Sequence, residues 1–231
     1  MTLVGIDGCY GGWVCVARQG SSVTAFLAPS IAAVLARVEH CAVIAVDIPI
    51  GLTDQGPRIC DLIARKKLGK PRGSSVFPAP VRAALPGRTH AEASELHQRA
   101  DGRRMSLQAF GILGKIQEVD TLLSSDPALQ QTVREIHPEL SFAVWNANQP
   151  MQHRKSRPAG RSERDLLIES KWPGLRAKLV GQLRGCAYKP DDLTDALAAL
   201  WTAERIQAGT AQLIPTDPPR DLLGLRMEMW A

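Results

Sequence analysis

Two aspartates end apolar segments in which aspartate is otherwise unfavourable. Asp7 follows the run Leu3–Ile6, and Asp47 follows the run Ala42–Val46. Aspartate is disfavoured in strands because it buries poorly and its carboxylate competes for backbone hydrogen bonds. In α/β sheets, functional groups collect at the carboxyl ends of such strands. Two carboxylates meeting there would repel each other unless one is protonated or a divalent cation lies between them. The alternative is that each aspartate caps a loop.

A second acidic pair begins the last predicted helix, which spans residues 192–207. Asp192 and Asp195 are three residues apart, so both side chains lie on one face of that helix. Asp191 fits an N-cap and Asp192 fits the first turn, whereas Asp195 lies inside an Ala/Leu run that predicts burial. Hard cations such as Mg²⁺ or Mn²⁺ bind carboxylate oxygens of this kind. We therefore predict a metal site with four ligands: Asp7, Asp47, Asp192 and Asp195.

Further ionisable residues end a predicted strand over residues 132–137. The string Arg134-Glu135-Ile136-His137-Pro138-Glu139 holds four of them within six positions. Because clustered ionisable groups at a strand end are typical of functional sites, Glu135 and His137 are candidate catalytic residues. His137 could orient a water or a phosphate, or cap the turn. For any single acid in this string, a surface salt bridge is the alternative.

The net charge of +5 is concentrated in two basic runs, residues 58–72 and 153–164. Such clusters suit a phosphate backbone, although exposed loops often carry similar runs without function. Aromatic residues make up only 5% of the chain, which argues against a base-stacking platform for single strands. The candidate nucleic-acid-binding residues are Arg65, Lys66, Lys67, Arg82, Lys115, Arg154 and Lys155.

The elements that must position these residues alternate between strand and helix patterns. Strands are predicted over residues 3–7, 13–18, 23–27, 42–48 and 132–137. Helices are predicted over residues 30–38, with Ser30 as N-cap, 106–123 and 192–207, with helical pieces over 164–183 broken at Pro173-Gly174. Short connections make the first three strands antiparallel neighbours, and the run over 42–48 indicates a strand covered on both faces.

This pattern predicts an α/β fold with a mixed five-stranded sheet, the first strand near the middle and helices on its faces. One domain is expected over residues 1–231, with a helical insertion at about 53–105 and a mobile basic loop at about 146–163. The chain lacks an apolar run long enough to cross a bilayer and a basic stretch ahead of an apolar N-terminal core. No membrane association and a cytoplasmic location are expected.

The positions of the acids resemble the RNase H-like fold, and RuvC-type Holliday junction resolvases most of all. Four strings are similar to a bacterial family, domain-of-unknown-function family 429, which is described as predicted RNase H-like nucleases. They are Gly5-Ile6-Asp7-Gly8-Cys9-Tyr10-Gly11-Gly12-Trp13-Val14, Asp47-Ile48-Pro49-Ile50-Gly51-Leu52, Ser74-Ser75-Val76-Phe77-Pro78-Ala79-Pro80-Val81-Arg82 and Arg134-Glu135-Ile136-His137-Pro138-Glu139-Leu140-Ser141-Phe142. With the Asp192-x-x-Asp195 pair, the resemblance covers nearly the whole chain.

The resemblance implies metal-dependent hydrolysis of phosphodiester bonds in DNA or RNA. Two Mg²⁺ or Mn²⁺ ions about 4 Å apart would share Asp7, Asp47, Asp192 and Asp195, activate a water and stabilise the leaving oxygen. Asp47 stands where resolvases usually have glutamate. The Ser-Ser-Val-Phe and His-Pro-Glu strings have no resolvase counterpart and could form a pocket of their own. Action on a four-way junction would require a twofold homodimer.

Two other functions remain open at the level of sequence. One is a nucleic-acid or nucleotide-binding module that keeps the fold without the reaction. The other is an ATP-dependent phosphotransferase, since actin-like ATPases and sugar kinases share the Asp-Gly start of the first strand. Those folds usually need two such domains and a second glycine-rich loop, to which Asp47-Ile48-Pro49-Ile50-Gly51 is a weak match.

Overall fold

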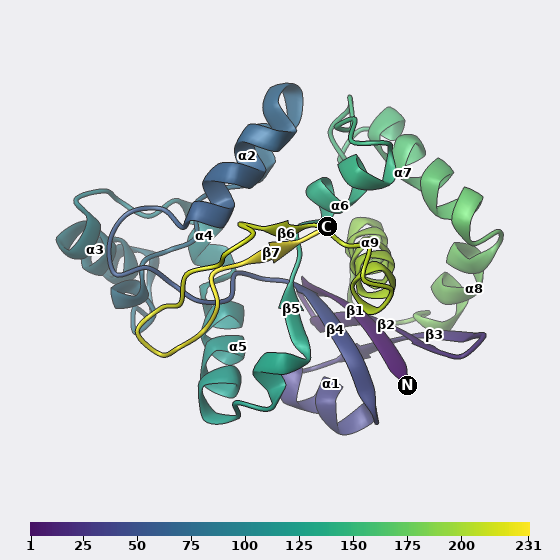
Figure 1. Ribbon diagram of the computed structural model, residues 1–231, viewed down its shortest axis with the longest axis horizontal. Helices are drawn as coiled ribbons and strands as arrows, with labels where there is room; N and C mark the ends of the chain where they lie inside the picture. The colour runs from purple at the N-terminus through teal and green to yellow at the C-terminus, as the bar shows by residue number, and fades with distance from the viewer.

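The centre of the protein is a mixed five-stranded sheet. A computed structural model describes residues 1–231, and Figure 1 shows its elements. The strands of this sheet are β1 (Thr2–Cys9), β2 (Gly12–Gln19), β3 (Ser22–Ala28), β4 (Cys41–Asp47) and β5 (Val133–Glu135). Their order is β3-β2-β1-β4-β5; β1 pairs antiparallel with β2 and parallel with β4. The predicted fold class is confirmed, including three antiparallel strands followed by parallel ones and the central position of the first.

Nine helices and a small hairpin complete the chain. The helices are α1 (Ile31–Arg37), α2 (Ile59–Arg72), α3 (His90–Asp101), α4 (Leu107–Gly111), α5 (Leu113–Ser125), α6 (Pro138–Trp145), α7 (Pro158–Lys171), α8 (Leu175–Gln182) and α9 (Pro190–Gln207). The hairpin joins β6 (Leu213–Ile214) to β7 (Met229–Trp230), and the sequence patterns gave no sign of it. None of the helices combines the length and apolar composition that a bilayer span requires.

Several predicted boundaries need correction. The expected continuous helix over residues 106–123 is divided at Ile112 into α4 and α5. The expected loop at about 146–163 ends early, because α7 begins at Pro158, where proline suits the first turn. The break at Pro173-Gly174 is confirmed, since Gly174 adopts a left-handed φ of 72° between α7 and α8. Ser30 caps α1 as predicted, accepting a hydrogen bond from the Ala33 amide at 3.1 Å.

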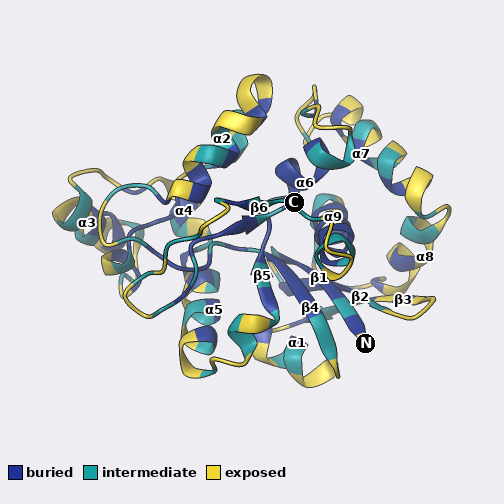
Figure 2. Ribbon diagram, in the orientation of Figure 1, coloured by how far each residue is buried: buried dark blue, intermediate teal, exposed yellow.

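Alternation along the strands divides the interior into two cores, one on each face of the sheet. In β1, Val4 and Ile6 pack with α1 and α5, so Leu3, Gly5 and Asp7 face the opposite side. That opposite side is covered by α9 and α8, as Figure 1 shows. Most residues in the middle of β1, β2 and β4 are buried, while the outer surfaces of α2, α7 and α8 are exposed (Figure 2).

Gly5 allows α9 to lie directly on β1. A β-carbon at this position would overlap the Leu200 backbone nitrogen and the Ala196 carbonyl oxygen. Because both obstacles are helix backbone, neither can move without shifting the whole of α9. Ala199 and Ala203, two further small residues of α9, pack against β4 in the same way. The close approach brings the N-terminal turns of α9 beside the carboxyl ends of β1 and β4.

We expect Gly5→Ala to lower the free energy of unfolding by about 2 to 3 kcal/mol, because the added methyl forces α9 away from β1. Denaturant unfolding measures the loss. Gly181→Ala is the matched control: it is a helical glycine of α8 with open space around it, so its stability should stay at the wild-type value or rise slightly. Equal stability of Gly5→Ala and wild type would contradict this packing.

Candidate active site

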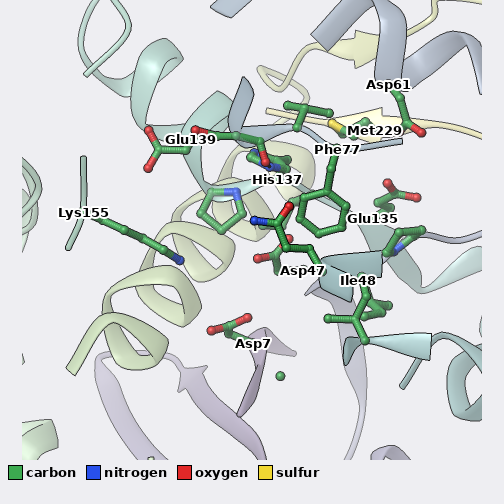
Figure 3. Close-up of a pocket in the computed structure, with 18 of the residues that line it drawn as sticks. Asp7, Asp47, Ile48, Asp61, Phe77, Glu135, His137, Glu139, Lys155 and Met229 are labelled. Atoms are coloured by element: carbon green, nitrogen blue, oxygen red, sulfur yellow. The ribbon is translucent and has the colours of Figure 1, made fainter. Parts of the chain in front are cut away.

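A pocket of about 640 Å³ opens at the carboxyl ends of β1, β4 and β5. One wall is the end of α2 with the segment that follows it, and the other is the start of α6 with residues 154–156. Figure 3 shows the side chains around this space, which include Asp7, Asp47, Phe77, His137 and Lys155. Both strings expected to form a separate pocket, Ser-Ser-Val-Phe and His-Pro-Glu, instead line the same pocket as Asp7 and Asp47.

Strand register brings Asp7 and Asp47 together. The two residues are partners in the parallel β1–β4 ladder. Both also lie on the face of the sheet that α9 covers, since Asp7 alternates with Ile6 and Asp47 with Val46, which belong to the other face. Asp7 is 8% exposed, and neither carboxylate accepts a hydrogen bond from the protein. The buried Asp7 and the partly buried Asp47 therefore lie side by side without the donors that would stabilise their charge.

The third acid of the cluster is Asp195 of α9, which is 1% exposed. Its Oδ2 accepts a hydrogen bond from the Lys155 ammonium, while its Oδ1 is buried without any partner. The same ammonium lies 3.9 Å from Asp191 Oδ2. Lys155 reaches this position from the loop between α6 and α7. In this structure, its ammonium is the cation nearest to Asp195.

The charges of this cluster shift one another's pKa values. Burial, followed by the nearby charges of Asp47 and Asp195, raises the pKa of Asp7. Burial and the charge of Asp195 raise the pKa of Asp47 to about 8. Burial also raises the pKa of Asp195 to about 6, although Lys155 opposes the shift. For Lys155, burial disfavours the ammonium, but Asp195, Asp7 and Asp47 outweigh burial and raise its pKa. One ammonium thus compensates three carboxylates incompletely.

The donor set fits a hard divalent cation. Asp7 and Asp47 have free carboxylate oxygens, and Asp195 Oδ1 and Glu139 Oε2 are buried without hydrogen-bond partners. Such oxygens are the ligands that Mg²⁺ and Mn²⁺ prefer. The side chains do not, however, converge here into a group of three that could already hold a metal. Binding therefore requires the carboxylates to turn toward one another and Lys155 to release Asp195.

Asp192 has a different position from the one expected. Helix α9 starts at Pro190 with Lys189, not Asp191, as its N-cap. The side chain of Asp192 forms a hydrogen bond back to the Lys189 backbone. The Asp192 carboxylate accepts the Lys189 backbone N–H at 2.7 Å and is not part of the pocket lining. Asp191, which the sequence assigned to capping alone, lines the pocket instead. The predicted pairing of Asp192 with Asp195 around one ion is not supported.

Both carboxylate oxygens of Glu135 are engaged in a buried ion pair with Arg58. Its two oxygens accept hydrogen bonds from Arg58, each at 2.7 Å, and one also accepts the Ile50 N–H at 2.6 Å. Asp61 takes the other edge of the same guanidinium at 2.6 Å. All three ionised side chains are about 2% exposed. The geometry does not support a catalytic role for Glu135; it ties the start of α2 to the sheet.

His137 lines the pocket, as expected of a functional residue. Its Nε2 lies 3.3 Å from the Ser75 carbonyl oxygen, and its Nδ1 is buried without a partner. Burial lowers the pKa of His137, which favours the neutral ring. With Nε2 donating to the Ser75 carbonyl, Nδ1 would be an acceptor. The imidazole thus connects the start of α6 with the segment after α2.

The predicted cationic residues separate into pocket and framework positions. Lys115 lies at the pocket, donates to the Gly12 carbonyl at 2.6 Å and lies over the Trp13 ring; Arg154 and Lys155 are also in the lining. Arg82 does not fit the predicted phosphate contact, because it donates to Asp120 and Asp221. The remaining three, Arg65, Lys66 and Lys67, lie on α2 outside the pocket. Arg65 donates a hydrogen bond to the Val76 carbonyl and Lys67 donates one to the Gln212 side chain, while Lys66 is exposed.

The pocket residues that sequence reasoning did not assign to the site include Glu139, Asp191 and Arg72. Glu139 was recognisable only as part of a dense ionisable string, and the structure pairs it with the buried Arg164 of α7. Asp191 was masked by its suitability for capping. Arg72 belonged to a basic run whose members look alike in sequence, yet it is 7% exposed and no protein acceptor contacts its guanidinium.

These features define an α/β protein with a carboxylate cluster at the carboxyl edge of its sheet and cations around that cluster. The chain belongs to the family described as Protein of unknown function (DUF429), whose model matches residues 5–220. The matched region includes all the acids that line the pocket. Comparison with curated proteins and with solved structures found no match.

Without divalent metal, we expect Asp47→Asn to raise the free energy of unfolding at pH 8 by about 1 to 2 kcal/mol, because it removes a buried charge from the cluster. The folded protein holds a proton on Asp47 up to about pH 8, whereas the unfolded chain releases it near pH 4. Wild-type stability should therefore fall as pH rises between these values, and the variant should show a weaker fall. Thermal melting in EDTA from pH 5 to 8 measures both.

Asp54→Asn is the matched control for this substitution, since Asp54 is exposed and forms no side-chain hydrogen bond. Its melting temperature should follow the wild-type dependence on pH. An Asp47→Asn protein with the stability and pH dependence of wild type would show that the carboxylates do not repel one another.

Proposed function

We propose that this protein is a divalent-metal-dependent nuclease that hydrolyses phosphodiester bonds of nucleic acid. The observation that carries the proposal is that Asp7 and Asp47 line one pocket as neighbours in the sheet, and that the buried Asp195 of α9 lies close enough to raise the pKa of both, although the three acids lie far apart in the sequence. Buried carboxylates without donors are costly to keep, and a bound cation is the ordinary means by which proteins compensate them.

Each part of the pocket has a place in this reaction. Asp7, Asp47 and Asp195 would hold Mg²⁺ or Mn²⁺, with Glu139 able to contribute its free oxygen. The metal supplies acidification of a bound water and stabilisation of charge on the leaving oxygen. Lys115 and Arg154, at the pocket, would bind phosphates of the backbone without reading sequence.

The architecture supports the same proposal. The strand order β3-β2-β1-β4-β5, with acids on β1 and β4 and on the last long helix, is similar to the RNase H-like arrangement that the sequence resembles. Likeness of fold does not by itself determine function, so the carboxylate cluster carries more weight than the topology. A cytoplasmic location, expected from the sequence, is part of this proposal.

The two alternative functions explain the pocket less well. A module that only binds nucleic acid would gain nothing from buried carboxylates, because they repel phosphates and one another. A phosphotransferase of the actin or sugar-kinase type would need a second glycine-rich phosphate loop. In this chain, the backbone after Asp47 instead contributes the Ile50 amide to Glu135 and the Ile50 carbonyl to Arg58.

We expect Asp7→Asn and Asp195→Asn each to reduce Mn²⁺-dependent cleavage of nucleic acid by at least about 100-fold, because each removes a charged metal ligand. A panel of labelled single-stranded, duplex and junction DNA and of RNA measures cleavage. Asp54→Asn, an exposed acid outside the pocket, is the control and should keep full activity. Cleavage by both Asp7→Asn and Asp195→Asn at the wild-type rate would disprove the proposed reaction.

We expect Lys155→Gln to bind Mn²⁺ about tenfold more tightly than wild type at pH 7, because its ammonium no longer competes with the metal for Asp195. Isothermal titration calorimetry measures the affinity. Lys178→Gln makes the same change on exposed α8 and should leave it unaltered. Unchanged Mn²⁺ affinity in Lys155→Gln would show that the metal does not use the position that Lys155 fills.

A further inference from the structure

Arg72 stands apart from the other buried arginines of the protein. Arg58 pairs with Asp61 and Glu135, and Arg164 pairs with Glu139. Arg72 is 7% exposed, forms no ion pair and no hydrogen bond, and has a fully enclosed Nε. A buried guanidinium is normally paired with an anion. Because Arg72 lines the pocket, an anion that enters the pocket can pair with its guanidinium, for which the protein itself offers no partner.

The segment that follows Arg72 is held rigidly in place. Arg65 donates to the Val76 carbonyl, and Asp61 accepts the Ala79 N–H at 3.1 Å. His137 lies 3.3 Å from the Ser75 carbonyl. The three contacts come from two different elements, α2 and the start of α6, so the wall is fixed from both sides. Because the segment is already ordered, a ligand that binds to it pays little conformational entropy for ordering the protein.

Phe77, in the same segment, presents an aromatic ring to the pocket. The ring lines the same pocket as Asp47, His137 and Met229 (Figure 3), and it is half-buried against the main core. Stacking on such a ring suits every nucleobase, since each has a π face. The low aromatic content of the sequence argued against a stacking platform for a long single strand. It does not exclude one ring that takes one base.

The dimensions of the pocket limit what can reach the carboxylates. Its volume of about 640 Å³ is that of a small-molecule site, and the buried Asp7 and partly buried Asp47 belong to its lining. In an intact duplex, each base is paired and stacked, so it cannot turn its face to Phe77. A nucleotide that is already unpaired, at a strand end or in a single strand, has both base and phosphate free.

We propose that Arg72 and Phe77 form a subsite for one unpaired nucleotide, with the phosphate on Arg72 and the base stacked on Phe77. The hydroxyl groups of Ser74 and Ser75, in the same lining, are further donors for the phosphate. The role of this subsite in selecting substrates rests on the proposed nuclease function. The enzyme would then act on unpaired nucleotides in preference to continuous duplex.

The first test measures binding without catalysis. Isothermal titration calorimetry of the full-length protein in EDTA compares AMP with ribose 5-phosphate, which lacks the base. Wild type should bind AMP about tenfold more tightly than ribose 5-phosphate. Phe77→Leu should lose that difference while keeping the affinity for ribose 5-phosphate. Equal affinities of wild type for the two ligands, or no binding of either, would overturn the proposal.

The second variant, Arg72→Gln, should bind both ligands at least about tenfold more weakly, because it removes a charge-assisted contact to the phosphate. Arg184→Gln makes the same change at an exposed position outside the pocket and should bind as wild type does. Thermal melting establishes that each variant is folded. If Arg72→Gln does not fold, the affinities of Phe77→Leu for AMP and ribose 5-phosphate test the subsite instead. If folded Arg72→Gln binds AMP and ribose 5-phosphate as tightly as wild type does, the phosphate does not bind to Arg72 and the proposal is refuted.

Cleavage distinguishes this proposal from the nuclease proposal. With Mn²⁺, wild type should cut single strands faster than blunt duplex, and Phe77→Leu should lose that preference. AMP binding without cleavage of any nucleic acid would leave the subsite standing and refute the nuclease function. Cleavage without a preference for unpaired strands, together with absent AMP binding, would support the nuclease and refute the subsite.

Discussion

The conflict among the carboxylates of Asp7, Asp47 and Asp195 determines the character of this protein. Packing of α9 on β1 at Gly5 brings the buried Asp195 close to Asp7 and Asp47, and Lys155 compensates only part of their charge. A sheet edge of this kind is less stable than one with neutral side chains would be. Proteins retain such destabilising arrangements at functional sites, where the same charges are needed for binding or catalysis.

Arg58 and Arg164 have a different task, because each is paired with buried acids. Arg58 joins Glu135 of β5 to Asp61 of α2, and Arg164 of α7 holds Glu139 at the start of α6. Both arginines fix elements that form the walls of the pocket. Removing one member of such a pair leaves the other charge buried without a partner, which is strongly destabilising. The framework around the acids is therefore more rigid than a surface loop would be.

The pocket combines two chemistries on different parts of its surface. Its floor carries carboxylates suited to a cation, whereas one wall carries the unpaired Arg72 and the ring of Phe77. A cation and a phosphate attract each other, so a metal on the floor would reduce the repulsion between the acids and an incoming nucleotide. The two halves of the pocket are consistent with one substrate that carries both an apolar ring and a phosphate.

The sequence by itself determined the strands, their antiparallel start and the aspartates that end them, because alternation and apolar runs are local properties. Only the tertiary structure decided which ionisable residues meet. Glu135 pairs in register with Val46, whose side chain lies on the face opposite to Asp47, so Glu135 reaches Arg58 instead. Likewise, the sequence could not show that Arg82 is paired and Arg72 is not, since partners distant along the chain are chosen by register and helix packing.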